Sequence, residues 1–219
     1  MEGRLKMTAK GKGVYQKAGC EIRAATVQAA EAGAEGKMTL TGYAVRFETP
    51  ASYENFGRNG ERYTETIKRG ALDRTDMSGV VLRYNHADSV MAMARTKNGS
   101  LRLTVDEFGV KIEADLIDTQ VNRDLYRAVQ AGLIDKMSFA FVVRDGGSVW
   151  RSSKEEIRRD ITDIEKIYDV SIVDEPFYAE TDVSARMRET VDAELRRLDD
   201  RKGFNNDVLR LQIALKGKV

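Results

Sequence analysis

The distribution of apolar residues between residues 38 and 173 places the strongest constraint on the fold of this chain. In this region they occur in short runs, most of which alternate with polar residues. Alternation with a period of two places every second side chain on one face of a β-strand. The sequence therefore favours many short strands over long helices, and we predict a mainly β fold with helices, of the α+β class.

One segment inside this region has helical spacing instead. Thr119 can cap its N-terminus and Gly132 can end it. The apolar stripe that we expect this helix to bury consists of Val121, Leu125, Ala128 and Val129. Many short strands with one crossing helix are typical of a β-barrel, closed or partly open, with peripheral helices.

Two turn signals separate neighbouring strands. Residues 97–100 contain Asn98 and Gly99, a pair that tolerates the positive φ angles of tight hairpin turns. Residues 106–109 mark a second turn, before the apolar run 110–114. We expect a β-hairpin at each of them.

The two ends of the chain differ from its middle. Residues 1–19 are rich in glycine and lysine with little periodicity, and we predict a flexible N-terminal arm there. Residues 20–182 form one predicted domain, and residues 183–219 form a predicted amphipathic helical C-terminal tail. The apolar positions of the tail are Val183, Met187, Val191, Leu195, Leu198, Val208, Leu211 and Leu215.

Charge and composition argue against several functions. The 36 Lys and Arg residues almost balance the 35 Asp and Glu residues, so no overall positive field exists to hold nucleic acid. A single cysteine, Cys20, allows no internal disulfide and fits a reducing compartment. One histidine and one cysteine cannot form the usual zinc sites, and we expect neither a metal nor a cofactor. The sequence shows no membrane-spanning run and no secretory signal, which predicts a soluble cytoplasmic protein that does not bind membranes.

The chain contains one histidine, His86. Acid–base chemistry by an imidazole would therefore have to use this residue. It follows the apolar run 80–84, at the point where a predicted strand becomes polar. A lone histidine at a strand end is usually a surface residue. A general base must nevertheless reach both a nucleophile and a substrate, and the end of a strand provides such a position.

A serine near the start of a second strand is the candidate nucleophile. Ser138 shares one strand face with Ala140 and Val142, whereas Phe139 and Phe141 share the other. We expect the aromatic face to be buried in the core. The serine then lies on a face of small residues, where a scissile carbonyl can approach its hydroxyl.

An aspartate on a third predicted strand completes the set. Asp169 lies opposite an apolar strand face, where its carboxylate can accept the second ring N–H of His86. A histidine, a hydroxyl and a carboxylate are the parts of a serine-hydrolase triad. The residues leave three competitors open: Ser171 as the nucleophile, and Asp88 or Asp174 as the acid.

Several short motifs also occur in the order used by a known family. They are Leu40–Phe47, Lys68–Leu72, Tyr84–His86, Ala94–Leu101, Asp118–Thr119, Met137–Phe141, Asp169–Val173 and Pro176–Tyr178. Together they resemble the prohead, or head maturation, proteases of tailed bacteriophages, which are similar to the herpesvirus assembly proteases. The resemblance covers residues 20 to 186 and rests on the order of the motifs, since no single motif is long.

This resemblance implies a herpesvirus-protease-like barrel in a protease domain over residues 20–182. It also implies a phage-encoded serine endopeptidase with His86, Ser138 and Asp169 as its catalytic triad. The family commonly has glutamate in place of this aspartate. Arg95 is a candidate for shaping the oxyanion region, with a surface ion pair as the alternative.

The implied substrates are the scaffold or the scaffold-like segment of the major capsid protein, and the protease itself. The implied location is the procapsid in the host bacterial cytoplasm, and self-association is a further implied property. Two other functions stay open. A non-catalytic capsid scaffolding protein would use the helical tail as an assembly handle. An esterase is disfavoured because no Gly-x-Ser-x-Gly elbow surrounds Ser138.

Overall fold

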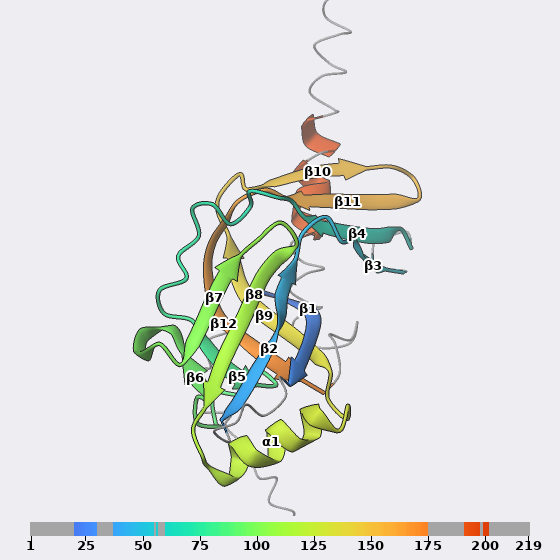
Figure 1. Ribbon diagram of the computed structural model, residues 1–219. Coiled ribbons are helices and arrows are strands. Elements are labelled where there is room, and N and C mark those ends of the chain that lie inside the picture. The colour runs from blue at the N-terminus through green and yellow to red at the C-terminus, as the bar shows by residue number, and fades with distance from the viewer. Residues whose placement is uncertain are drawn as a thin grey trace, which may run out of the picture.

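The computed structural model describes residues 20–29, 37–54, 56, 60–174, 191–197 and 199–201. Two β-sheets make up most of this part of the chain, together with the helix α1 (Gln120–Gln130) and the short 3-10 helix η2 (Thr96–Asn98). In Figure 1, α1 lies below the larger sheet and the smaller sheet lies above it. The prediction of a mainly β fold with helices is confirmed.

The larger sheet has eight strands in the order β6-β5-β12-β9-β1-β2-β8-β7. Their bounds are β1 (Cys20–Ala29), β2 (Met38–Arg46), β5 (Val81–Tyr84), β6 (Ala94–Arg95), β7 (Leu101–Val105), β8 (Gly109–Leu116), β9 (Lys136–Val143) and β12 (Ile164–Val173). Strand β12 pairs with β9 in antiparallel and with β5 in parallel orientation. It therefore lies between the two strands that carry Ser138 and lead to His86.

This sheet curves but does not close into a barrel. Its two outermost strands, β6 and β7, form no ladder with each other within the described residues, although the short helix η2 joins them directly. The closed form of the predicted barrel is therefore not present, and the herpesvirus-protease-like arrangement stays a prediction. The hairpin expected at residues 97–100 is wrong for the same reason, because that turn connects opposite edges of one sheet.

The second predicted hairpin is confirmed. Strands β7 and β8 pair in antiparallel orientation across the turn at residues 106–109. The Asp106 carboxylate accepts hydrogen bonds from the backbone N–H of Phe108 at 2.8 Å and of Gly109 at 3.0 Å. This aspartate thus supplies the local contact that closes the turn.

The helix α1 begins as expected and buries most of the predicted stripe, since Leu125 and Val129 are buried and Ala128 packs half-buried against the core, so only Val121 departs from the prediction. The Thr119 hydroxyl accepts a hydrogen bond from the N–H of Asn122, as an N-cap should, and Gly132 follows the helix with φ of 69°. Val121 of the predicted stripe is 52% exposed. Asn122 takes the inward position instead, because its amide donates to the backbone carbonyl of Ile117. The buried residues of the helix are Asn122, Leu125, Tyr126 and Val129.

The smaller sheet has the strand order β10-β11-β4-β3. Its strands are β3 (Ala51–Tyr53), β4 (Arg62–Ile67), β10 (Ser148–Ser152) and β11 (Glu156–Ile161). The inner residues Phe56, Tyr63 and Ile157 form a second apolar cluster, apart from the main core of the larger sheet. A buried ion pair lies on these strands as well, with Arg159 donating to the Glu65 carboxylate at 3.1 Å.

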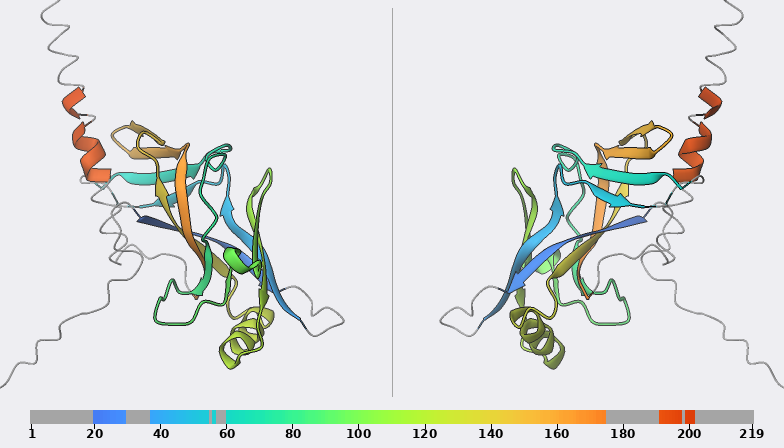
Figure 2. Two further views of the ribbon diagram at one scale, coloured as in Figure 1. Left: turned by 90° about the vertical axis from the view of Figure 1, so that its left-hand side faces the viewer. Right: turned by 90° about the vertical axis from the view of Figure 1, so that its right-hand side faces the viewer.

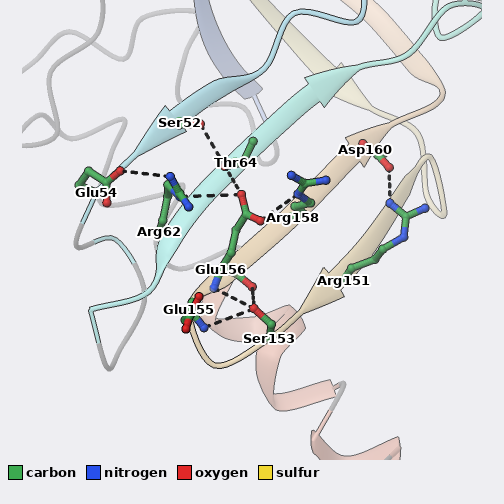
Figure 3. A network of polar contacts seen from close by, with 10 residues as sticks. All are labelled: Ser52, Glu54, Arg62, Thr64, Arg151, Ser153, Glu155, Glu156, Arg158 and Asp160. Carbon is green, nitrogen blue, oxygen red and sulfur yellow. Dashed lines mark hydrogen bonds and ion pairs between the residues drawn. The ribbon is translucent and has the colours of Figure 1, made fainter.

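Charged side chains cover one surface of this sheet (Figure 3). The carboxylate of Glu156 accepts hydrogen bonds from the Thr64 hydroxyl at 2.8 Å and from the Arg158 guanidinium at 3.0 Å. Arg151 bonds to Asp160 on the neighbouring strand as a separate pair in the same view. Polar pairs of this kind suit a solvated sheet face.

Part of the predicted C-terminal tail packs against the smaller sheet. Residues 191–197 and 199–201 are helical, and Figure 2 shows this segment beside the sheet. Val191 is 1% exposed and joins the cluster of Phe56, Tyr63 and Ile157, with Leu195 packed against it. The predicted arm at residues 1–19 and the predicted domain boundary at residues 182 and 183 lie outside the described residues, so the domain division stays a prediction.

Candidate active site

Three adjacent strands bring the candidate catalytic residues to one region of the larger sheet. Asp169 on β12 is the register partner of Val81 on β5 and of Ala140 on β9. Two residues further along β12, Ser171 is the register partner of Ser138. Register partners in neighbouring strands project from the same face of a sheet. Asp169, Ser171 and Ser138 therefore share one face, and the chain reaches His86 just beyond the end of β5.

His86 contacts the predicted acid directly. Its Nδ1 atom lies 2.8 Å from Oδ1 of Asp169, and the two side chains are 12% and 2% exposed. An ionised carboxylate only accepts hydrogen bonds, so Nδ1–H donates and Nε2 is the ring nitrogen that can accept a proton. Aspartate is one methylene shorter than the glutamate common in the resembled family, yet here it reaches the imidazole.

Ser171 links the same carboxylate to the histidine backbone. Its hydroxyl donates to Oδ1 of Asp169 at 3.0 Å and accepts from the backbone N–H of His86 at 3.2 Å. The residue is completely buried. Because the Ser171 hydroxyl both donates and accepts a hydrogen bond, the geometry favours a structural role for this residue. It does not favour Ser171 as the nucleophile.

Ser138 lies on the strand next to the Asp169–His86 pair. It is 4% exposed, and Ala140 on the same face is completely buried. On the opposite face, the rings of Phe139 and Phe141 are buried and stack with centroids 4.6 Å apart, as the alternation predicts. Among the described residues, Ser138 Oγ makes no hydrogen bond to His86. The contact between nucleophile and base is often long in free enzymes and tightens when substrate binds.

The competing acids occupy other positions. Asp88 is exposed. Asp174 binds the Tyr84 hydroxyl at 2.6 Å and the Asn85 amide at 2.9 Å, at the place where β5 ends. Arg95 on β6 is exposed, and its guanidinium enters no ion pair in the described part of the chain. Its role in an oxyanion site stays a prediction.

The described residues contain neither a candidate metal-binding cluster nor a helix that could span a membrane. They contain no group of three or more His, Cys, Asp or Glu side chains that could hold a metal ion. None of their helices is long and apolar enough to cross a membrane.

The comparison with protein families identifies the class of this chain. A family model of serine proteases matches residues 23–195, which is more than half of the chain, so the protein is a serine peptidase. That family is described as the caudovirus prohead serine proteases, and the chain belongs to it. The protein is accordingly a capsid maturation protease, and its substrates are those of this process, capsid protein or scaffold.

A solved structure is also similar to this chain. It is the capsid assembly protease of bacteriophage T4, with a TM-score of 0.43 and 12% sequence identity. The alignment covers 71% of this chain and 98% of that one. No curated protein matches the sequence.

Proposed function

We propose that this prohead protease is an endopeptidase with a Ser138–His86–Asp169 triad. Ser138 Oγ attacks the peptide carbonyl while Nε2 of His86 takes the hydroxyl proton. The same nitrogen returns the proton to the leaving amine, and an acyl-enzyme forms. Water then attacks the ester, losing a proton to His86, and the acid product leaves with Ser138 restored. Asp169 fixes the imidazole tautomer and stabilises the imidazolium.

One observation carries this assignment. The hydrogen bond between the only histidine and a buried carboxylate lies beside the strand that holds Ser138. Burying a carboxylate is costly unless it is paired and hydrogen-bonded. A buried aspartate that contacts the histidine is therefore less readily explained by chance packing than the presence of a nearby serine. The family membership adds the nucleophile class, which is serine.

We further propose that the protease acts inside the procapsid, where it removes the scaffold or the scaffold-like segment of the major capsid protein. Removal of scaffold would free volume for DNA and make assembly irreversible. The proposal extends to the protease itself as a substrate, with cuts in residues 1–19 or near residues 203–206. Intact mass after prolonged incubation tests this extension, with Ser138→Ala as the uncut reference.

Co-expression with the cognate capsid protein tests the triad. Wild type should shorten the capsid protein or scaffold, whereas His86→Ala and Ser138→Ala should not. Asp88→Asn is the matched control, because this acid is exposed and has no place in the proposed triad. Shortening by all four proteins would remove the triad assignment. Cleavage by wild type and Ser138→Ala but not by His86→Ala would assign the nucleophile to another residue.

The alternative of a non-catalytic scaffolding protein relied on the apolar stripe of the tail as a free assembly handle. In the structure, Val191 and Leu195 of this stripe pack on the smaller sheet. That part of the stripe is used within the chain, so it does not favour the alternative.

A further inference from the structure

The turn that carries His86 has an unusual backbone. Asn85 and His86 both have positive φ angles, 48° and 54°. Left-handed backbone is unfavourable for any residue with a Cβ atom, although Asn tolerates it better than most. Two such residues in succession need tertiary contacts that hold them in place.

The contacts that hold Asn85 come from the end of β12. Its backbone N–H donates to the carbonyl of Ile172 at 2.8 Å. Its side-chain amide donates to Oδ2 of Asp174 at 2.9 Å, and its side-chain oxygen accepts from the N–H of Asp174 at 3.1 Å. The two side-chain bonds are reciprocal, so they fix both the position and the rotation of Asn85.

Tyr84 is held by the same carboxylate. Its hydroxyl lies 2.6 and 2.5 Å from the two oxygens of Asp174 and donates to them. This hydrogen bond raises the pKa of Tyr84 to about 12, the direction expected when a phenol donates to a carboxylate. Asp174 thus binds the two residues that immediately precede His86.

We propose that Tyr84, Asn85 and Asp174 form a clamp that positions His86 for catalysis. The hydrogen bonds described for the clamp join its three members to one another, and none of these bonds involves Ser138 or the imidazole, so its members are positioning residues. Strand β12 supplies the Asp169 carboxylate that orients the ring, and the residue directly after this strand, Asp174, belongs to the clamp that fixes the turn. The carboxylate that contacts the ring and the carboxylate that holds the turn are therefore only five residues apart on one stretch of chain. The catalytic part of this inference rests on the triad proposed above.

The single histidine gives the clamp a direct readout. In protein without a histidine tag, the imidazole ¹⁵N signals belong to His86 alone. When its imidazole is neutral, the wild-type protein should show one tautomer, with the proton on Nδ1 facing Asp169. Loss of the clamp should produce a mixture of tautomers, a change that mere loss of stability in a still-folded protein would not cause.

Two tyrosine variants form a matched pair. Tyr84→Phe removes a phenol–carboxylate hydrogen bond from the clamp. Tyr43→Phe removes a similar bond, from the Tyr43 hydroxyl to Asp106 at 2.7 Å, in another part of the sheet. Only Tyr84→Phe should alter the His86 tautomer and lower kcat.

Substitutions of Asn85 separate the backbone from the clamp. Asn85→Gly allows positive φ freely but loses both reciprocal bonds, whereas Asn85→Ala loses the bonds and strains the turn. Asp174→Ala loses the bonds from the other side. We expect Asn85→Gly and Asp174→Ala each to lower kcat by about 10- to 100-fold, the effect of a roughly 1 Å displacement of a catalytic group, with little change in KM.

The outcomes separate this inference from the proposed triad. If Asn85→Gly and Asp174→Ala keep wild-type kcat and a single Nδ1–H tautomer, the clamp does not position His86. If Asn85→Gly alone matches wild type, backbone conformation suffices and the clamp is likewise refuted. Full activity of His86→Ala would instead refute the triad, and the tautomer comparison would still decide whether the clamp orients the ring.

Discussion

Replacement of Asp169 by asparagine tests the reasoning about the site most severely. The side chain is buried, and its Oδ1 accepts hydrogen bonds from both His86 Nδ1 and the Ser171 hydroxyl. Asparagine has the same size and shape, so the packing should survive. Its amide can however present N–H to the ring. In that orientation His86 must carry its proton on Nε2, which leaves no lone pair to accept the proton of Ser138.

The expected loss is large. The change removes the negative charge 2.8 Å from the imidazole and also permits the wrong tautomer. In serine hydrolases of known mechanism, this substitution lowers kcat about 10,000-fold. Such a factor corresponds to about 5 kcal/mol in the activation free energy. KM should change little, because the Asp169 side chain is only 2% exposed and so is not available for contact with a substrate.

The assay is a time course of capsid-protein cleavage with purified enzymes. Asp88→Asn serves as the control for loss of an acidic residue, and its rate should equal that of wild type. The imidazole ¹⁵N spectrum of Asp169→Asn should show the Nε2–H tautomer. A loss smaller than about tenfold in a variant with this tautomer would refute the argument, since catalysis would then not depend on the orientation that Asp169 imposes.

Three further predictions follow from other contacts. Ser171→Ala should lower kcat by about tenfold in steady-state kinetics, because it removes one of the two hydrogen bonds that Asp169 accepts. Cleavage should remain detectable, and complete inactivity of the folded variant would make Ser171 the nucleophile. Glu65→Gln should lower the unfolding free energy by about 3–5 kcal/mol in urea titrations, since it breaks a buried ion pair. Glu156→Gln, at a half-buried position whose Arg158 partner is exposed, should lose only a small fraction of that. Arg102 lowers the pKa of Asp115, so their pair stabilises the fold above the unfolded carboxyl pKa of about 3.9. The stability difference between wild type and Arg102→Gln should therefore shrink as the pH falls below that value, and a constant difference would contradict the linkage.

The strand faces of the site could be read directly from the sequence. Alternation in β9 placed Phe139 and Phe141 in the core and Ser138 on the opposite face, because a strand has only two faces. The helix was less determined. Leu125 and Val129 of the predicted stripe are buried, but in the first turn Asn122 takes the inward position in place of Val121, because its amide donates a hydrogen bond to the carbonyl of Ile117.

Long-range connections could not be read in the same way. Asn98 and Gly99 signal a turn, but a turn does not specify whether the strands on either side pair with each other. The left-handed turn at His86 also lay beyond pattern reasoning, because it depends on Asp174, which is distant in sequence. Asn85 was the available signal, since asparagine is enriched at positive φ.

The central place of β12 has a consequence for the order in which activity arises. Translation proceeds from the N-terminus, and β12 is the last strand of the larger sheet to leave the ribosome. A nascent chain that ends before residue 164 already contains His86 and Ser138, but it lacks the strand that separates and aligns β5 and β9. It also lacks the carboxylate of Asp169 and the anchor at Asp174. With the proposed triad, full activity can therefore arise only after the whole larger sheet has been synthesised and β12 has inserted between β5 and β9.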